Sequence, residues 1–225
     1  KTILVRAFAN LLPQMSKVEI LESTRIYSIA GHLDPSMPLI VNRPFREIHH
    51  TASAVSIIGG GALSAKPGEI TLAHNGVLFF DEITEFPKYV LEALRQPLED
   101  KYINISRANF NARFPCNFIF IGTMNPCPCG YKTDSKIRCI CTPHDIQNYL
   151  KKLSGPILDR IDIFLDVPNI PIKNIFNEKP TVRKVPNSNA IFIKVSGKNL
   201  VIILNKLGLK SGNKKTNNQS SIQTG

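Results

Sequence analysis

Two adjacent carboxylates, Asp81 and Glu82, directly follow the apolar run Val77-Leu78-Phe79-Phe80. A continuous apolar run is typical of a buried parallel strand, and ligands of open α/β sheets bind at the carboxyl ends of such strands. An aspartate at this place can hold the hydration shell of Mg²⁺, and a glutamate can polarise an attacking water, as nucleotide hydrolysis requires. An ordinary solvated acidic pair at a strand end is the alternative.

The dipeptide Lys1-Thr2 matches the end of a phosphate-binding loop, G-x-x-x-x-G-K-[ST]. In that loop the lysine neutralises the terminal phosphates and the hydroxyl binds Mg²⁺. The dipeptide is common by chance, so it gains meaning only from the carboxylates downstream. Leu4 and Phe8 recur at helical spacing up to Pro13, which predicts a helix. Because the chain opens inside this element without an initiator methionine, we expect a fragment that lacks the glycine loop and its preceding strand.

Two further polar residues stand where they could act on a nucleotide. Asn125 follows the apolar run 118–121 and can orient an attacking water, although a turn-forming asparagine is the alternative. Arg160 lies on a predicted short helix and can reach the γ-phosphate bound by a neighbouring subunit. A surface arginine paired with Asp159 or Asp162 is the alternative for this residue.

Four cysteines, Cys127, Cys129, Cys139 and Cys141, form the pattern C-x-C-x₉-C-x-C on one basic loop. Four thiolates are the ligand set of a closed structural zinc site, while unligated thiols or a redox pair are the alternatives. Cys116 lies outside the cluster before an apolar strand, and we expect it in the core. We expect structural or loop roles for the histidines that lack ligand spacing to these cysteines: His49, His50, His74 and His144.

The elements that must position these residues alternate between helices and apolar strands, which favours an α/β architecture with a mainly parallel sheet. Residues 31–68 are rich in Pro and Gly and predict no long element. Beyond them, the patterns predict a helix opened by Pro87 with Leu91, Leu94 and Leu98 on one stripe, a hairpin around Arg107-Ala108-Asn109, a helix capped by Thr142, and a strand over 163–167.

The order of the phosphate-loop remnant, acidic strand end, asparagine strand end and arginine resembles the AAA+ ATPases. The strings between these sites narrow the resemblance to the magnesium-chelatase-like ComM/YifB family, over roughly residues 1–168. They are Arg43-Pro-Phe-Arg46, His49-His-Thr-Ala-Ser53, Gly59-Gly-Gly61, Pro67-Gly-Glu-Ile70, Leu72-Ala-His-Asn-Gly-Val-Leu78, Leu91-Glu-Ala-Leu-Arg-Gln-Pro-Leu-Glu99, Ile105-Ser-Arg-Ala108, Met124-Asn-Pro-Cys-Pro-Cys-Gly130 and Leu153-Ser-Gly-Pro-Ile-Leu-Asp-Arg-Ile-Asp162.

The resemblance implies an α/β AAA+ P-loop core with a mainly parallel sheet flanked by helices. It implies ATP and Mg²⁺ as cofactors and sites shared between subunits of a ring, a homo-hexamer. The residues carried over are Lys1 and Thr2 as the end of Walker A, with Thr2 and Asp81 towards Mg²⁺, Asp81 and Glu82 as Walker B, Asn125 as sensor 1, and Arg160 as the arginine finger.

The resemblance also makes the hairpin from Tyr102 to Phe114 an insertion before sensor 1, whose basic tip residue lines a pore and follows DNA. Arg107 occupies that place, and an arginine at a hairpin tip can contact phosphates without reading bases. The function implied for the parent protein is an ATP-driven helicase or branch-migration ATPase acting on single-stranded or branched DNA. The fragment itself is expected to be inactive. A chelatase-like remodelling subunit and a nonenzymatic nucleic-acid-binding fragment are the alternatives.

Composition bounds these expectations. The net charge of +11 is concentrated in residues 168–225, which carry ten Lys and Arg against the single acidic residue Glu178. We therefore divide the chain into an AAA+ core over 1–167 and a basic, Asn/Lys-rich and partly disordered tail over 168–225, in which no helical lid is recognisable. Glu47-Ile48 departs from the family pattern. No apolar run suits a membrane span. The odd number of five cysteines, all between Cys116 and Cys141, fits a reducing cytoplasm better than a disulfide framework.

Overall fold

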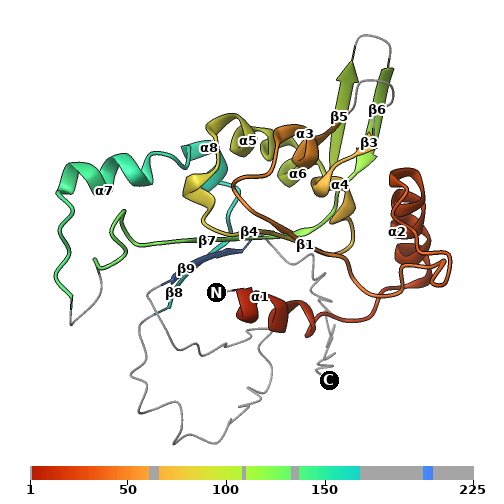
Figure 1. Ribbon diagram of the computed structural model, residues 1–225, viewed down its shortest axis with the longest axis horizontal. Helices are drawn as coiled ribbons and strands as arrows, with labels where there is room; N and C mark the ends of the chain where they lie inside the picture. The colour runs from red at the N-terminus through yellow and green to blue at the C-terminus, as the bar shows by residue number, and fades with distance from the viewer. Residues whose placement is uncertain (1, 61–65, 108–109, 133–136, 168–199, 205–225) are drawn as a thin grey trace, which may run out of the picture.

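A five-stranded sheet organises the computed structural model, which describes residues 2–60, 66–107, 110–132, 137–167 and 200–204 (Figure 1). The strand order is β1 (Phe45–Ile48), β4 (Val77–Phe80), β7 (Ile119–Met124), β9 (Leu200–Leu204) and β8 (Ile163–Val167). The first three strands are parallel, whereas β9 runs antiparallel to both β7 and β8. The sheet therefore has a parallel half that ends in the polar residues singled out in the sequence.

Strand β4 is apolar throughout because both faces of the sheet are buried at this strand. Val77 and Phe79 pack with α1 (Thr2–Ala9) in one buried cluster, and Leu78 and Phe80 belong to a second cluster on the other face. All four strand residues are fully buried. The predicted buried parallel strand is confirmed, and β7 differs only in extending from Ile119 to Met124 rather than over 118–121.

The helices are distributed unequally over the two faces. In Figure 1, α1 lies on one side of the sheet, and the other side is covered by α3 (Ala54–Ile58), α4 (Glu69–Leu72), the 3₁₀ helix η1 (Ile83–Glu85), α5 (Lys88–Ala93), α6 (Arg95–Asp100) and α8 (Gly155–Leu158). Helix α1 ends at Ala9, four residues before Pro13, and Leu11 is 60% exposed. Its apolar face is therefore shorter than predicted.

One predicted helix is two in the structure. Pro87 precedes α5 as expected, but the helix is interrupted at Leu94, between the end of α5 and the start of α6. Pro97 has no N–H to continue the helical hydrogen-bond ladder, which accounts for an interruption one turn before it. Leu91, Leu94 and Leu98 nevertheless share one buried face, as their spacing predicts.

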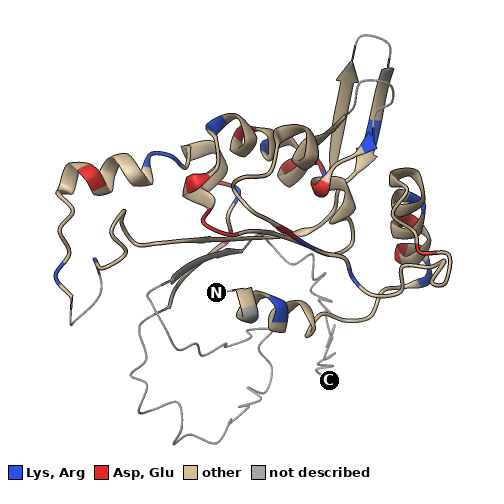
Figure 2. Cartoon of the chain, in the orientation of Figure 1, with Lys and Arg blue, Asp and Glu red and all other residues tan. Residues whose placement is uncertain are grey.

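Helix α2 (Lys17–Ala30) was not predicted, although its start carries a recognisable signal. Ser16 and Glu19 form a capping box, and Gly31 ends the helix with a left-handed φ of 73°. Only Ser23 and Ile26 on this helix are buried, so it lacks a broad apolar stripe. Figure 2 shows Lys, Arg, Asp and Glu interspersed along it.

Two small antiparallel pairs complete the described fold. Strands β2 (Gly59–Gly60) and β3 (Lys66–Pro67) pair within the Pro- and Gly-rich stretch. Strands β5 (Tyr102–Arg107) and β6 (Phe110–Pro115) form the predicted hairpin, with Arg107 opposite Phe110, and it projects away from the sheet in Figure 1. The hairpin is anchored in the core by Ile103, Ile105 and Phe114.

The last elements are α7 (Pro143–Leu150), β8 and β9. Thr142 caps α7 in a capping box with Asp145, as predicted. Of the predicted tail, the structure describes residues 200–204 as strand β9, and its other residues lie outside the described ranges. Within those ranges, no helix has the length and apolar character needed to cross a membrane.

Candidate nucleotide site and cysteine cluster

The carboxyl ends of β4 and β7 lie side by side because Phe80 is in register with Gly122. The next residues therefore meet: the Thr123 hydroxyl donates to Oδ1 of Asp81 at 2.5 Å and accepts a hydrogen bond from the backbone N–H of Glu82 at 3.2 Å. Thr123 is fully buried, so this link is shielded from water. The sequence argument assigned no role to Thr123, and its only signal is its place two residues before Asn125.

Glu82 adopts a backbone conformation that is rare for a residue with a side chain. Its φ of 55° and ψ of 53° lie in the left-handed region, at a cost of about 1 kcal/mol or more. Its side chain is 43% exposed at the edge of the sheet. Strain of this kind persists where surrounding contacts hold it, and the hydrogen bond from Glu82 N–H to Thr123 is such a contact.

His50 is a neighbour of Glu82 that the sequence argument placed only in a loop. It follows β1, the next parallel strand along the sheet, and its Nδ1 lies 4.0 Å from Oε2 of Glu82. The His49 and His50 rings lie against each other with centroids 4.2 Å apart and their planes tilted by 35°. Three parallel strands thus contribute a histidine, a carboxylate pair and Asn125 to one edge.

Tyr149 of α7 connects the Asn125 segment with the segment that follows Glu82. Its hydroxyl accepts a 2.7 Å hydrogen bond from the Thr84 hydroxyl and a further one from the backbone N–H of Asn125. Tyr149 is 7% exposed, and burial raises its pKa. The sequence pattern identified Tyr149 only as part of an apolar helix face.

Three other predicted site residues lie at the ends of described elements or outside the described ranges. Thr2 is the first residue of α1, and Lys1 lies outside the described residues. Arg107 is the last residue of β5, and the structure does not describe its side chain. Their proposed roles remain predictions.

Arg160 follows α8 and is held within its own chain. Its guanidinium forms an ion pair with Glu99 of α6 and donates to the carbonyl of Pro156 at 2.5 Å. Glu99 is thus one acidic partner of Arg160, and the sequence analysis did not name it. Arg160 hydrogen bonding holds the pKa of the Glu99 carboxyl below its ordinary value.

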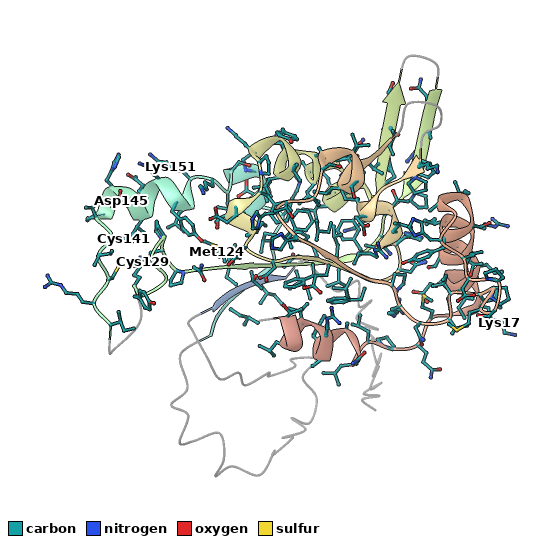
Figure 3. The ribbon with its side chains drawn as sticks, in the orientation of Figure 1. Lys17, Met124, Cys129, Cys141, Asp145 and Lys151 are labelled. Carbon is teal, nitrogen blue, oxygen red and sulfur yellow. The ribbon has the colours of Figure 1, made fainter. Side chains whose placement is uncertain are left out.

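The four clustered cysteines converge, as their spacing suggested. All four Sγ atoms lie within 4.8 Å of one another, and Cys127, Cys129 and Cys139 are separated by 3.4–3.7 Å. Figure 3 places Cys129 and Cys141 near Asp145 at the start of α7. Cys116 is separate and fully buried, as predicted, and burial raises its pKa to about 12.

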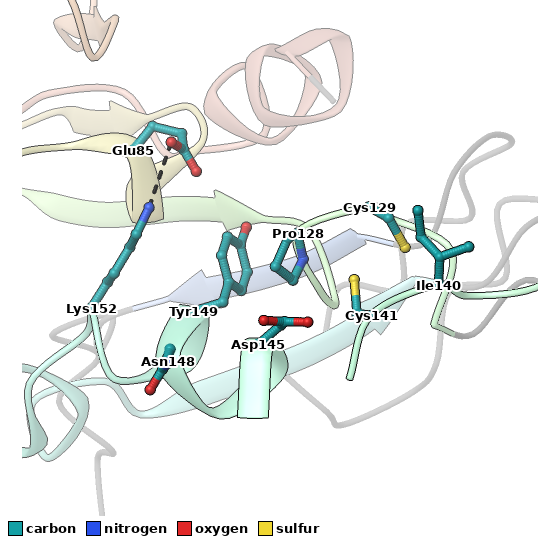
Figure 4. A pocket seen from close by; sticks show the side chains of 9 residues that line it. All are labelled: Glu85, Pro128, Cys129, Ile140, Cys141, Asp145, Asn148, Tyr149 and Lys152. Atoms are coloured by element: carbon teal, nitrogen blue, oxygen red, sulfur yellow. Dashed lines mark ion pairs between the residues drawn. The ribbon is translucent and has the colours of Figure 1, made fainter. Parts of the chain in front are cut away.

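An open cavity of about 690 Å³ lies between the cysteine loop, α7 and η1 (Figure 4). Cys129 and Cys141 line one side, and Tyr149 lies between them and Glu85. Lys152 Nζ and Glu85 Oε2 form an ion pair of 3.6 Å across another side. The cysteine cluster and the strand ends are thus connected through α7.

A parallel half-sheet covered by helices, with an acidic pair and an asparagine at neighbouring carboxyl ends, defines an AAA+ P-loop type of core. Residues 1–175 match the family model described as magnesium chelatase, subunit ChlI, and the chain belongs to this magnesium-chelatase-like family. The expected fold class and the resemblance to ComM and YifB are both confirmed.

Three curated relatives illustrate the family. The chain is 44% identical over 177 residues to competence protein ComM of Haemophilus influenzae, covering 79% of this chain and 34% of that protein. It is 44% identical over 171 residues to YifB of Salmonella typhimurium, covering 76% and 33%. It is 21% identical to the magnesium-chelatase 67 kDa subunit of Heliobacterium mobile, covering 87% and 33%. The chain thus spans about a third of the length of these relatives.

Proposed function

We propose that this chain is the ATPase core of a DNA motor that hydrolyses ATP between the subunits of a homo-hexameric ring. The observation that carries the proposal is the buried hydrogen-bonded link of Asp81, Thr123 and Glu82 at the ends of β4 and β7. Family membership supports nucleotide use. The sequence holds both an acidic strand end and a Lys1-Thr2 dipeptide of the phosphate-loop type. Mg²⁺ would neutralise phosphate charge when bound.

The donor set of the site suits this cofactor pair. One oxygen of Asp81 accepts from Thr123, and its remaining lone pairs can accept the hydration water of a cation. Glu82, partly exposed beside them, takes a proton from the attacking water, and Asn125 orients that water. Lys1 and Thr2 bind the phosphate side. Arg160 of a neighbouring subunit stabilises the charge that develops on the transferred phosphoryl group.

DNA is proposed as the partner because the hairpin β5–β6 projects from the core and places Arg107 beside its tip. A single arginine contacts phosphate without sequence readout, which suits a motor that moves along single-stranded or branched DNA. A DNA partner and free thiols both fit the cytoplasm. Because the match covers only 34% of the curated relative ComM, the activity of a whole protein belongs to this proposal.

We also propose a structural zinc ion in the cysteine cluster. Four convergent sulfur atoms on an irregular loop match the closed Cys₄ zinc site, and zinc has the tetrahedral preference that such a set satisfies. This second metal is distinct from Mg²⁺, which prefers oxygen ligands.

The test is steady-state ATP hydrolysis by the chain extended by the glycine loop and by the remaining length of its relatives. We expect Mg²⁺-dependent turnover that single-stranded or branched DNA stimulates. Turnover indifferent to DNA would contradict the DNA motor and favour chelatase-like remodelling, the second candidate, which the magnesium-chelatase relative supports. DNA binding without turnover would favour the nonenzymatic alternative.

A further inference from the structure

The sulfur cluster has the dimensions of a metal site. With Zn–S distances of about 2.3 Å, the sulfur atoms of a regular tetrahedron are about 3.8 Å apart. Three of the separations observed here, Cys127–Cys129, Cys127–Cys139 and Cys129–Cys139, are 3.4, 3.7 and 3.5 Å. Cys141 completes the set within 4.8 Å. Four ligands therefore surround one point.

Metal binding explains this arrangement better than a redox pair. A disulfide would bring two sulfurs to about 2.05 Å and would require nothing of the other two thiols. Here three sulfurs are nearly equidistant. Backbone N–H groups of Tyr131 and Ile140 hydrogen bond to the Cys129 sulfur and hold it in the cluster.

The cysteine cluster connects the segment after β7 with the start of α7, and both lie near the sheet edge that carries Asp81, Glu82 and Asn125. Cys127 is buried and lies two residues after Asn125, at the end of β7. Cys141 directly precedes Thr142, whose side chain caps α7. A metal ion bound here would therefore fix the start of α7 against the end of β7.

Helix α7 returns to the same edge through Tyr149. The Tyr149 hydroxyl accepts hydrogen bonds from the Asn125 backbone N–H and from Thr84, two residues after Glu82. Tyr149 is thus hydrogen bonded to the backbone of Asn125, and the four clustered cysteines lie between these two residues in the sequence. Displacing α7 would release both hydrogen bonds.

We infer that a zinc ion held by Cys127, Cys129, Cys139 and Cys141 forms a clasp that keeps Tyr149 in place as a positioning residue for Asn125 and the segment after Glu82. Its effect on turnover rests on the ATPase function proposed above, whereas the clasp itself does not. Loss of zinc then loosens the site without removing any residue that touches ATP.

The first experiment measures metal in the 225-residue chain itself, purified under reducing conditions without chelator. We expect one zinc per chain in the wild type and in Cys116→Ala, which removes a buried thiol outside the cluster, and loss of zinc in Cys139→Ala. Cobalt(II) loaded in place of zinc should show the intense visible absorption of tetrahedral thiolate coordination. Metal-free wild type, or equal zinc in both variants, would overturn the site.

The second experiment follows amide hydrogen exchange in the same chain before and after zinc removal. We expect faster exchange at Asn125 and along α7, with α2 unchanged as an internal reference. Tyr149→Phe should keep its zinc yet show the same faster exchange at Asn125, because only the hydroxyl is lost. Unchanged exchange on zinc removal would overturn the clasp even if zinc is bound.

Activity provides the third readout, in the chain extended to the length of its relatives. Tyr149→Phe should lower kcat about tenfold with KM for ATP unchanged, the size typical of lost outer-shell positioning. An unchanged kcat would overturn the positioning role. If the unmutated extended chain hydrolyses no ATP, the proposed function fails, and metal content and exchange still decide the clasp.

Discussion

The hydroxyl of Thr123 joins the ends of two strands: it donates to Oδ1 of Asp81 at 2.5 Å and accepts the backbone N–H of Glu82 at 3.2 Å. The Thr123 side chain is fully buried, whereas Asp81 and Glu82 are partly exposed at the edge of the sheet. Hydrogen bonds to an ionised carboxylate are stronger than those between neutral groups. Thr123 therefore fixes the acidic pair relative to Asn125, which lies two residues further on, just after β7 ends.

Replacing Thr123 by valine should destabilise the chain by about 1.5–3 kcal/mol, the worth of a hydrogen bond to a charged group. The substitution keeps the shape of the side chain but leaves the Glu82 N–H without its acceptor. Urea unfolding of Thr123→Val against the wild type measures this difference. ATP turnover in the extended chain should fall as well, because Asp81 loses its orientation.

Thr71→Val is the matched control. Thr71 is equally buried, but its Oγ1 has no hydrogen-bond partner among the described residues. Removing an unsatisfied buried hydroxyl is nearly neutral or stabilising. Equal destabilisation of the two variants would show that the loss at Thr123 reflects packing rather than its link to Asp81.

Glu82→Gln should abolish ATP hydrolysis in the extended chain while ATP binding persists. The amide keeps the size of the side chain but cannot accept the proton of the attacking water, and general-base catalysis is worth about 10²–10⁴ in rate. Turnover and nucleotide binding are measured on the same preparation. Glu85→Gln, an exposed carboxylate three residues further, should keep its turnover. Normal turnover in Glu82→Gln would show that Glu82 is not the general base.

Much of this edge could be predicted from local pattern. The apolar runs before Asp81 and Asn125 specify strands buried on both faces, and parallel strands end together, so both residues were expected at one site. The cysteine spacing likewise suggested a cluster, which the sulfur distances match. In these cases the signal is local, and the longest of these patterns runs only from Cys127 to Cys141.

Contacts set by long-range register could not be predicted. Thr123 reaches Asp81 only because β4 and β7 pair in one particular register, and His50 faces Glu82 only because β1 adjoins β4. The hydrogen bond between the Tyr149 hydroxyl and Thr84 could be predicted only if the position of α7 relative to the sheet were known. Helix α2 is different, since its capping box was visible in the sequence but its buried stripe is too narrow to reveal a helix.

Arg107→Ala should weaken the stimulation of ATP turnover by DNA and leave basal turnover unchanged. Loss of one phosphate contact should also reduce the salt dependence of DNA binding by about one unit in log–log slope. Arg113→Ala is the control on the same hairpin, where its guanidinium stacks over Tyr102 at 3.5 Å. We expect little effect of Arg113→Ala on stimulation. Equal DNA stimulation of ATP turnover in the two variants would contradict a specific role of Arg107 in DNA binding.

Arg160→Ala should lower hydrolysis in the ring by about 10³–10⁵, the range for an arginine that completes a neighbouring site. Mixing Arg160→Ala subunits with Glu82→Gln subunits should restore part of the activity, because some interfaces then pair an intact Glu82 with an intact Arg160. Glu99→Gln, which removes one ion-pair partner of Arg160 within its own chain, should retain hydrolysis. Absence of rescue on mixing would contradict action across the interface.

His74 should make the stability of the fold depend on pH. It is 6% exposed, its Nδ1 accepts the backbone N–H of Asn117 at 3.0 Å, and its Nε2 lies 3.3 Å from Oε2 of Glu22. This geometry needs a neutral ring, since a proton on Nδ1 would face the Asn117 N–H. Burial lowers the pKa of His74 below its ordinary 6.5, although Glu22 acts in the opposite direction.

The unfolded chain therefore takes up the His74 proton at a higher pH than the folded chain does. The stabilisation is fully present above pH 6.5 and is lost as the pH falls from there through the lowered folded pKa, by at most about 1.4 kcal/mol per pH unit. Urea unfolding at pH 8 and pH 5 should show a larger drop for the wild type than for His74→Gln, whose side chain does not titrate. Parallel pH profiles for the two proteins would mean that His74 binds its proton equally in the folded and unfolded chain.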